Sequence, residues 1–349
     1  MKTFSFFENK ISKMIIIIIA IILCFCAVFY LLFSNKKSYY DDNKINIVTS
    51  FYPMYTIASN VAKDIPEIEV TNLTASNTGC LHDYQITTSD MIKLSHADVL
   101  VVNGDGMENF IEKAISTYDD LKIVNASEGI KDRHEELLGI YKHDEDDDHS
   151  HEEENGEDEE HEHYHENDEH DGHEHHHDHG ENSHYWVSIT LYIEQVKNVK
   201  NQLSDIFPQY EEIFKINAIN YINKLNDLNN RLHQVVYNSD SNKNIVTFHE
   251  AFDFFAEELG LNIVAVIERE PGTYPSARDV ADIIDEVNSK NVSAIFVEPQ
   301  YSRSAADTIS RETGVKVFTL DPIVTGELEI DAYINIMNQN INTLEEALN

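Results

Sequence analysis

The sequence predicts an α/β protein made of two Rossmann-like parallel-sheet domains joined by one long, rigid helix. From Ile45 onward, short runs of β-branched residues alternate with helical patterns, and the same rhythm returns after Asn244. Continuous apolar strands separated by helices are typical of parallel sheets that are covered on both faces. Between the two halves, residues 208–237 contain no Gly and no internal Pro, which predicts the joining helix.

The individual elements follow from local patterns. The first half contains the predicted strands INIVTS, IEVTNLT, ADVLVVNG and KIVNAS, with helices over PMYTIASNVAKD, TSDMIKLSH and GMENFIEKAIS. The second half contains the predicted strands NIVTFHE, NIVAVIE, SAIFVEP and KVFTLDP, with helices over 251–259, 276–289 and 303–313 and a helix at the C-terminus. These patterns give two domains of similar design.

The joining helix is expected to bury one apolar face. Its apolar residues recur at three- and four-residue intervals, as on one side of a helix. They are Ile213, Ile216, Ile219, Ile222, Leu225, Leu228 and Leu232. Pro208 suits the first turn, where its missing N–H has no intrahelical partner.

A membrane anchor is predicted at the N-terminus. The segment 14–33 holds twenty residues without a charge, enough to span a hydrocarbon core of ~30 Å. Lysines flank it on both sides, and the basic residues before it favour a cytoplasmic N-terminus. The remainder of the chain is therefore expected on the extracytoplasmic face of the membrane.

Six segments result. They are an anchor or signal segment at 1–43, an N-terminal α/β domain at 44–142, a disordered insert rich in His, Asp and Glu at 143–183, the end of the N-terminal domain at 184–207, the linking helix at 208–238, and a C-terminal α/β domain at 239–349.

Charge and histidine are concentrated in the insert. The formal net charge is -38, and residues 143–184 hold twenty acidic residues without one Lys or Arg. Nucleic acid is an unsuitable partner for such a surface, because phosphate binding needs clustered cations. Twelve of the eighteen histidines lie between His143 and His179, which suggests a tether that collects metal. A solvated acidic linker without a metal role is the alternative.

Two matches to the zinc-protease motif H-E-x-x-H occur within the insert, at 161–165 and 173–177. Such a motif works only on a helix packed into a core that holds the ligands and the base. The insert is almost devoid of apolar residues, so no core can form around the motif. The two matches are therefore attributed to chance in a stretch composed mainly of His, Glu and Asp.

Three other histidines stand where strands end. His82 follows the second strand, His184 closes the insert, and His249 ends the strand NIVTFH. Asp321 ends the last strand. Ligands of parallel sheets bind beyond the carboxyl ends of the strands, so the four side chains form a candidate metal site. From their spacing alone, the three histidines could equally be unrelated surface or capping residues. His96, His134 and His233 are interpreted as polar-face residues.

These residues carry a resemblance to the metal-binding solute-binding proteins of zinc and manganese ABC importers, the zinc-uptake branch in particular. The matching stretches are Leu81-His82-Asp83-Tyr84 with Ser89-Asp90, Ser183-His184-Tyr185-Trp186 after a His-rich loop, Phe248 to Phe255 with Gly260-Leu261, FVEPQ and TLDP. Leu81 and Ser183 depart from the prolines usual in this family.

The resemblance implies a carrier rather than an enzyme, with His82, His184, His249 and Asp321 as metal ligands in an interdomain cleft. Water, another carboxylate or Cys80 could complete the site in place of Asp321. Imidazole ligands suit Zn²⁺, and carboxylate-rich sites suit Mn²⁺, which is the alternative metal.

The implied partner is an ABC importer permease that receives zinc from a monomeric, membrane-anchored chain. A zinc buffer or surface adhesin without a transport role is an alternative function. A zinc-dependent hydrolase would need an open coordination position and a general base such as Glu250 or Glu298.

Overall fold

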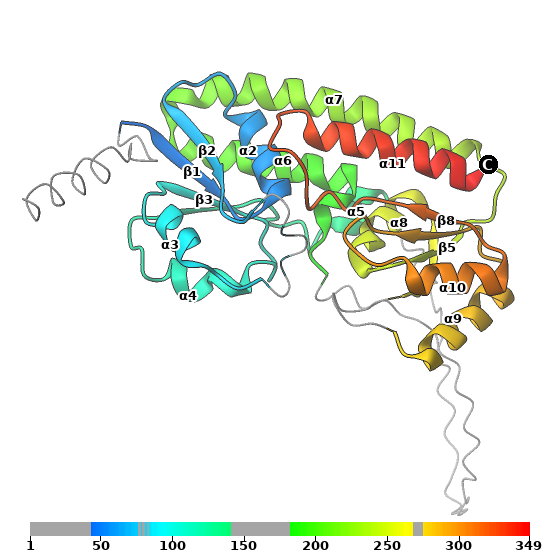
Figure 1. The fold of residues 1–349 in the computed structure, drawn as a ribbon. Helices are drawn as coiled ribbons and strands as arrows, with labels where there is room; N and C mark the ends of the chain where they lie inside the picture. The colour runs from blue at the N-terminus through cyan, green and yellow to red at the C-terminus, as the bar shows by residue number, and fades with distance from the viewer. Residues whose placement is uncertain (1–42, 76–77, 79–80, 82–83, 141–181, 268–274) are drawn as a thin grey trace, which may run out of the picture. The chain divides into compact units, whose positions relative to one another are not determined.

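The computed structural model describes residues 43–75, 78, 81, 84–140, 182–267 and 275–349 (Figure 1). The chain separates into two units, Met1–Ile45 and Asn46–Asn349, and the fold given below is that of the second unit. The predicted anchor, most of the predicted insert, Cys80 and the predicted ligand His82 lie outside the described residues. Within the part of the chain that is described, no helix combines the length and apolar character needed to cross a membrane.

The first parallel sheet has four strands in the order β2-β1-β3-β4. They are β1 (Ile45–Thr49), β2 (Ile68–Asn72), β3 (Val99–Val102) and β4 (Lys122–Asn125). Strand β3 pairs in parallel with β1 and with β4, and all of its residues are buried. The four strands predicted for the first half are confirmed.

Helices cover both faces of this sheet (Figure 1). They are α2 (Tyr52–Val61), α3 (Thr88–Leu94), α4 (Glu112–Ile115) and α6 (Ile189–Ile206). Leu100 and Val102 of β3 share one core with Met91 of α3 and Ile115 of α4. Helices α2 and α6 pack against each other and against the strands from the opposite face.

The second parallel sheet has the order β6-β5-β7-β8. Its strands are β5 (Asn244–Thr247), β6 (Asn262–Val266), β7 (Ala294–Val297) and β8 (Val317–Thr319). The helices beside it are α8 (Asp253–Leu259), α9 (Ala277–Lys290) and α10 (Ser304–Thr313). Val246 and Phe248 lie in one core with Val287 of α9 and Ile309 of α10. Two parallel-sheet α/β halves, as predicted, are therefore present.

Several helical segments differ from expectation. The helix predicted over 106–116 consists of a 3-10 turn at Asn109–Ile111 followed by the short α4. Helix α6 was not anticipated, although Ser188 caps it by accepting a hydrogen bond from the backbone N–H of Leu191. Short 3-10 turns also lie at Tyr185–Val187, Pro208–Tyr210 and Glu250–Phe252, and α5 spans His134–Leu138.

The long helix α7 (Glu211–Asn238) is present, but three of the seven residues predicted on its buried face are exposed. Ile213, Ile216 and Ile219 are exposed. The buried positions are Phe214, Ala218, Tyr221, Leu225, Leu228, Leu232 and Val236. The isoleucines recur every three residues, and because a helix has ~3.6 residues per turn they drift away from the packed side.

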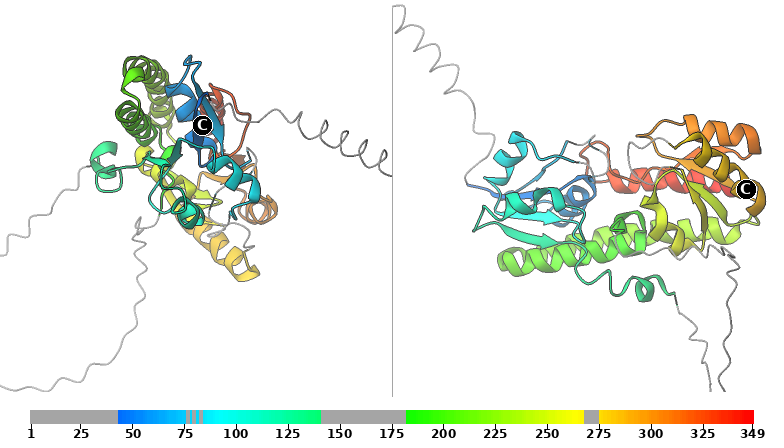
Figure 2. Two further views of the ribbon diagram at one scale, coloured as in Figure 1. Left: turned by 90° about the vertical axis from the view of Figure 1, so that its left-hand side faces the viewer. Right: turned by 90° about the horizontal axis from the view of Figure 1, so that it is seen from below.

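Helix α7 packs against elements from both halves of the chain. It contacts α2 and α6, and it also contacts the C-terminal helix α11 (Ala332–Leu348). The red α11 runs beside the green α7 in Figure 1, and Figure 2 gives two further views. Shared packing of this extent favours a stiff connection between the two sheets.

Glu258 of α8 joins three elements through polar contacts. It accepts hydrogen bonds from Ser188 Oγ, at 2.6 Å, and from Thr190 Oγ1 at the start of α6. Its Oε1 also lies 3.4 Å from Nε2 of His233 on α7. The hydrogen bond to Glu258 raises the pKa of His233 above its ordinary value of 6.5.

This contact predicts a pH-dependent contribution to stability. Since the folded-state pKa of His233 is raised, its stabilisation is complete below the ordinary pKa and is lost as pH rises through the folded pKa. His233 is half exposed, so we expect His233→Gln to lower the free energy of unfolding by only ~0.2–1 kcal/mol at acidic pH and by less at alkaline pH. Urea unfolding at about pH 5.5 and about pH 8.5 measures the difference. A deficit that grew with pH would contradict it.

Candidate metal centre

His249 is placed by strand β5. The strand is buried, Phe248 continues into the core, and His249 follows immediately before the 3-10 turn that leads into α8. Its side chain is 2% exposed. A buried imidazole at the carboxyl end of a parallel strand is in the position where such sheets bind ligands.

Glu298 lies beside His249 because of the register between β5 and β7. Ile245 pairs with Ala294 and Val246 with Ile295, so the same offset sets His249 opposite Glu298 just beyond the strand ends. Glu298 Oε1 is 3.6 Å from His249 Nδ1, and the Glu298 side chain is 3% exposed. From the sequence, Glu298 was expected to matter only as the general base of a hydrolase. Its position directly after the buried strand in FVEP was the available signal.

His184 is brought next to His249 from a distant part of the chain. The two ring centroids are 5.2 Å apart with the rings nearly perpendicular, at 86°. His184 is fully buried and precedes the turn Tyr185–Val187. The sequence prediction that these two histidines converge is supported by this geometry.

Asn182 fixes the orientation of the His184 ring. Its Oδ1 accepts from the backbone N–H of His184, at 3.0 Å, and lies 2.7 Å from His184 Nδ1. Its Nδ2 donates to the carbonyl of Glu250 and to Asp253 Oδ2, which settles which end of the amide is the acceptor. Nδ1 of His184 must therefore be the donor, and Nε2 is the nitrogen suited to a metal in the neutral imidazole.

A buried polar network lies behind His184. Asn103 Nδ2 donates to the carbonyl of Ser183, at 3.0 Å, and its backbone N–H donates to Glu108 Oε1, at 2.7 Å. Ser50 Oγ also donates to that oxygen, at 2.7 Å. Burial raises the pKa of Glu108 to about 7 despite these donors. The network attaches the segment that carries His184 to the ends of β1 and β3.

Trp186 connects the His184 segment to the segment that carries Asp321. Its Nε1 donates to the carbonyl of Pro322, at 2.8 Å, and its ring centroid is 5.0 Å from that of His184. Tyr333 of α11 donates to the Trp186 carbonyl, at 2.8 Å. The indole is fully buried, so these contacts are shielded from water.

Asp321 follows β8, and its backbone is hydrogen-bonded to the side chain of Asn340. Its N–H donates to Asn340 Oδ1 at 2.9 Å, and Asn340 Nδ2 donates to its carbonyl at 2.7 Å. The backbone N–H of Ile323 donates to Asp321 Oδ1, at 2.8 Å, with Ile323 at a φ of 61°. Burial raises the pKa of the Asp321 carboxyl. A positive φ is unusual for a β-branched residue and marks a strained turn.

The structure thus brings together some of the predicted site. His249 adjoins both His184 and Glu298, whereas His82 lies outside the described residues. Over the described ranges, no group of three or more His, Cys, Asp or Glu side chains that could hold a metal ion is found. Strand β7 lies between β5 and β8, which separates the strands of His249 and Asp321 by about 10 Å.

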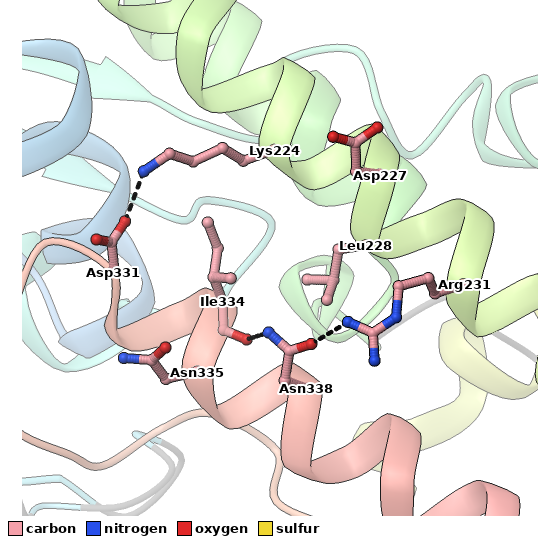
Figure 3. A pocket seen from close by; sticks show the side chains of 8 residues that line it. All are labelled: Lys224, Asp227, Leu228, Arg231, Asp331, Ile334, Asn335 and Asn338. Carbon is pink, nitrogen blue, oxygen red and sulfur yellow. Dashed lines mark hydrogen bonds and ion pairs between the residues drawn. The ribbon is translucent and has the colours of Figure 1, made fainter.

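A pocket of about 390 Å³ lies elsewhere, between α7 and α11 (Figure 3). Lys224 is paired there with Asp331 at 2.8 Å, and Arg231 donates to Asn338. None of the predicted ligands lines this pocket, and its lining residues lack the imidazole or thiol side chains that suit zinc.

Comparison with known proteins identifies the family. The family described as "Zinc-uptake complex component A periplasmic" matches residues 47–347. The chain is 30% identical to the zinc-binding lipoprotein AdcA of Streptococcus pneumoniae over 326 residues, which cover 92% of this chain and 59% of AdcA. It is 30% identical to the high-affinity zinc uptake system protein ZnuA of Bacillus subtilis over 312 residues, 88% of each chain.

A solved structure agrees with this assignment. The metal-dependent lipoprotein YcdH of Bacillus subtilis superposes with a TM-score of 0.64 at 28% identity, covering 87% of this chain and 99% of YcdH. The chain spans 59% of the length of the streptococcal relative AdcA. The resemblance seen in the sequence motifs is therefore confirmed, and the chain belongs to the periplasmic zinc-uptake complex component A family, whose members are uptake components and not enzymes.

Proposed function

We propose that this protein is an extracytoplasmic zinc carrier that captures Zn²⁺ between its two sheets and delivers it to the permease of an ABC importer. The observation that carries the proposal is the meeting of His184 and His249, two buried imidazoles with ring centroids 5.2 Å apart. These residues are separated by 65 positions in the sequence, and the fold brings their rings together. The relatives named above are zinc-binding or zinc-uptake proteins, which supports the same cargo.

The proposed ligands are His82, His184, His249 and Asp321. Three neutral imidazoles and one carboxylate suit four-coordinate Zn²⁺, with Mn²⁺ as the less suited cargo. With every coordination position filled by protein, no position remains to activate a water molecule. Such a site carries a metal and does not hydrolyse substrates.

The proposed domain division follows the two sheets. Residues 44–142 and 184–207 form the first domain, 208–238 the linking helix and 239–349 the second domain. His184 and His249 then come from different domains, so one ion ties both together. Because α7 packs against α2, α6 and α11, closure around the ion is expected to involve loop ordering and small tilts and not a wide hinge.

The segment 143–181 is proposed to collect zinc and to pass it to His184 at its own end. Interleaved carboxylates raise the local cation concentration, and neutral imidazoles bind zinc weakly along the segment. We expect deletion of 143–181 to lower the total zinc bound while about one tightly held zinc remains. Growth in zinc-chelated medium should slow. Unchanged growth would refute the collecting role and leave the cleft site unaffected.

The carrier function is tested by metal analysis followed by uptake. Purified full-length protein should bind zinc in preference to manganese, and Trp186, the only tryptophan, should report binding by fluorescence because its ring lies 5.0 Å from that of His184. Cells that lack the protein should lose high-affinity zinc uptake, and the intact gene should restore it. Zinc binding without any effect on uptake would instead indicate a zinc buffer or a surface adhesin.

A further inference from the structure

We propose that Glu298 is a positioning residue for His249, accepting a hydrogen bond from Nδ1–H so that Nε2 is presented to the zinc ion. The inference deepens the proposed function and rests on it. Glu298 is absent from the predicted ligand set, and the resemblance to zinc carriers did not assign it a role there.

Sheet register builds this pair. Strands β5 and β7 are neighbours, and the offset that pairs Ile245 with Ala294 sets His249 and Glu298 side by side beyond the strand ends. Adjacent strands lie about 4.8 Å apart, which leaves room for one side-chain contact between them. The observed separation of Nδ1 and Oε1 is 3.6 Å. Such contacts commonly shorten to hydrogen-bond length when the ligand binds.

Burial of Glu298 argues for a specific purpose. Its side chain is only 3% exposed, and a carboxylate that is removed from water is costly unless a donor or a positive charge compensates it. His249 would supply the donor once the 3.6 Å contact shortens to hydrogen-bond length. A zinc ion bound to His249 would add positive charge on the other side of the ring, which the Glu298 carboxylate would partly neutralise.

The second histidine of the site provides an internal comparison. His184 already directs Nδ1 to a protein oxygen, Asn182 Oδ1 at 2.7 Å, which leaves Nε2 as its metal-binding nitrogen. A carboxylate or carbonyl partner on the far ring nitrogen is the usual way in which proteins orient a metal-ligating histidine. Both described histidines would then be oriented in the same way, by an oxygen that accepts a hydrogen bond from Nδ1–H. The acceptor is a neutral amide at His184 and would be a charged carboxylate at His249.

Two substitutions separate the charge of Glu298 from its reach. Glu298→Gln keeps the length of the side chain and removes the charge, whereas Glu298→Asp keeps the charge and shortens the reach. We expect each to weaken zinc binding by the full-length protein about 10- to 100-fold, the range measured for loss of outer-shell partners. Competition titration with a zinc chelator measures this change.

A matched control is Glu258→Gln. Glu258 is also a buried carboxylate beside a histidine, with Oε1 3.4 Å from His233 Nε2, but it adjoins no predicted ligand. Zinc affinity of this variant should stay within about threefold of the wild type even if its stability falls, since distant sites act independently. In a His249→Ala background, Glu298→Gln should add no further loss of zinc affinity.

Cobalt spectra distinguish positioning from direct ligation. If Glu298 acts through His249, the visible absorption bands of the Co²⁺ complex keep their positions and intensities in Glu298→Gln. A changed spectrum would make Glu298 a ligand and overturn the proposal, as would zinc affinity equal to that of the wild type. Absence of zinc binding by the wild-type protein would overturn the proposed function itself, a result that this experiment separates from the others.

Discussion

His249→Ala is expected to reduce zinc affinity by more than about 100-fold, since even the loss of an outer-shell partner costs about 10- to 100-fold. The substitution removes one of two imidazoles whose ring centroids lie 5.2 Å apart in a buried site. It also removes the ring that lies 3.6 Å from the buried Glu298 carboxylate. Metal analysis of the purified protein, followed by calorimetric titration, gives the stoichiometry and the affinity.

His233→Ala is the matched control for this prediction. His233 lies on α7, is half exposed and contacts Glu258, so its loss should leave zinc stoichiometry unchanged. If His249→Ala bound zinc as tightly as the wild type, the two adjoining histidines would not be ligands of one ion. The site would then have to be sought elsewhere in the chain.

Most of the fold could be predicted because strands and helices leave local patterns. The strand INIVTS and the strand NIVTFHE were recognised from β-branched runs, and both lie in parallel sheets. The face of α7 was predicted less well, because Ile213, Ile216 and Ile219 resemble a packed stripe while the actual contacts are made by Phe214 and Ala218. Apolar residues alone do not show which side of a helix meets its neighbours.

The site was predictable only in part, for a related reason. His249 and Asp321 stand at strand ends that the pattern reveals, but the separation of their strands by β7 depends on strand order. Strand order and register are properties of the assembled sheet, and neither can be predicted from the sequence of a single segment. Only the structure therefore shows that Glu298 lies beside His249. It also shows that Asn182 orients the His184 ring.

Asn340→Leu is expected to lower stability and zinc affinity together. Asn340 on α11 is buried and makes two hydrogen bonds to the backbone of Asp321, at 2.9 and 2.7 Å. Leucine has the same branched arrangement of side-chain heavy atoms but no polar atom, so it leaves the N–H and the carbonyl of Asp321 without these partners. Each buried group that loses its partner costs about 1–3 kcal/mol of unfolding free energy.

The effect on zinc follows from how Asp321 is held. Ile323, at a φ of 61°, donates its N–H to Oδ1, and Trp186 donates to the neighbouring carbonyl of Pro322. With Oδ1 engaged, Oδ2 is the oxygen expected to coordinate zinc. This turn is strained and depends on surrounding contacts, so removal of Asn340 should release it and weaken zinc binding by about tenfold or more.

Asn338→Leu tests whether any change on α11 has the same result. Asn338 lies two residues before Asn340, accepts a hydrogen bond from Arg231 and contacts no part of the Asp321 turn through a described hydrogen bond. Its substitution should change the unfolding free energy by no more than about 0.5 kcal/mol and leave zinc affinity unaltered. Urea unfolding and zinc titration, compared across both variants and an Asp321→Ala background, measure the coupling. If Asn340→Leu weakened binding equally in the wild type and in Asp321→Ala, its effect would not pass through Asp321, which would contradict the prediction.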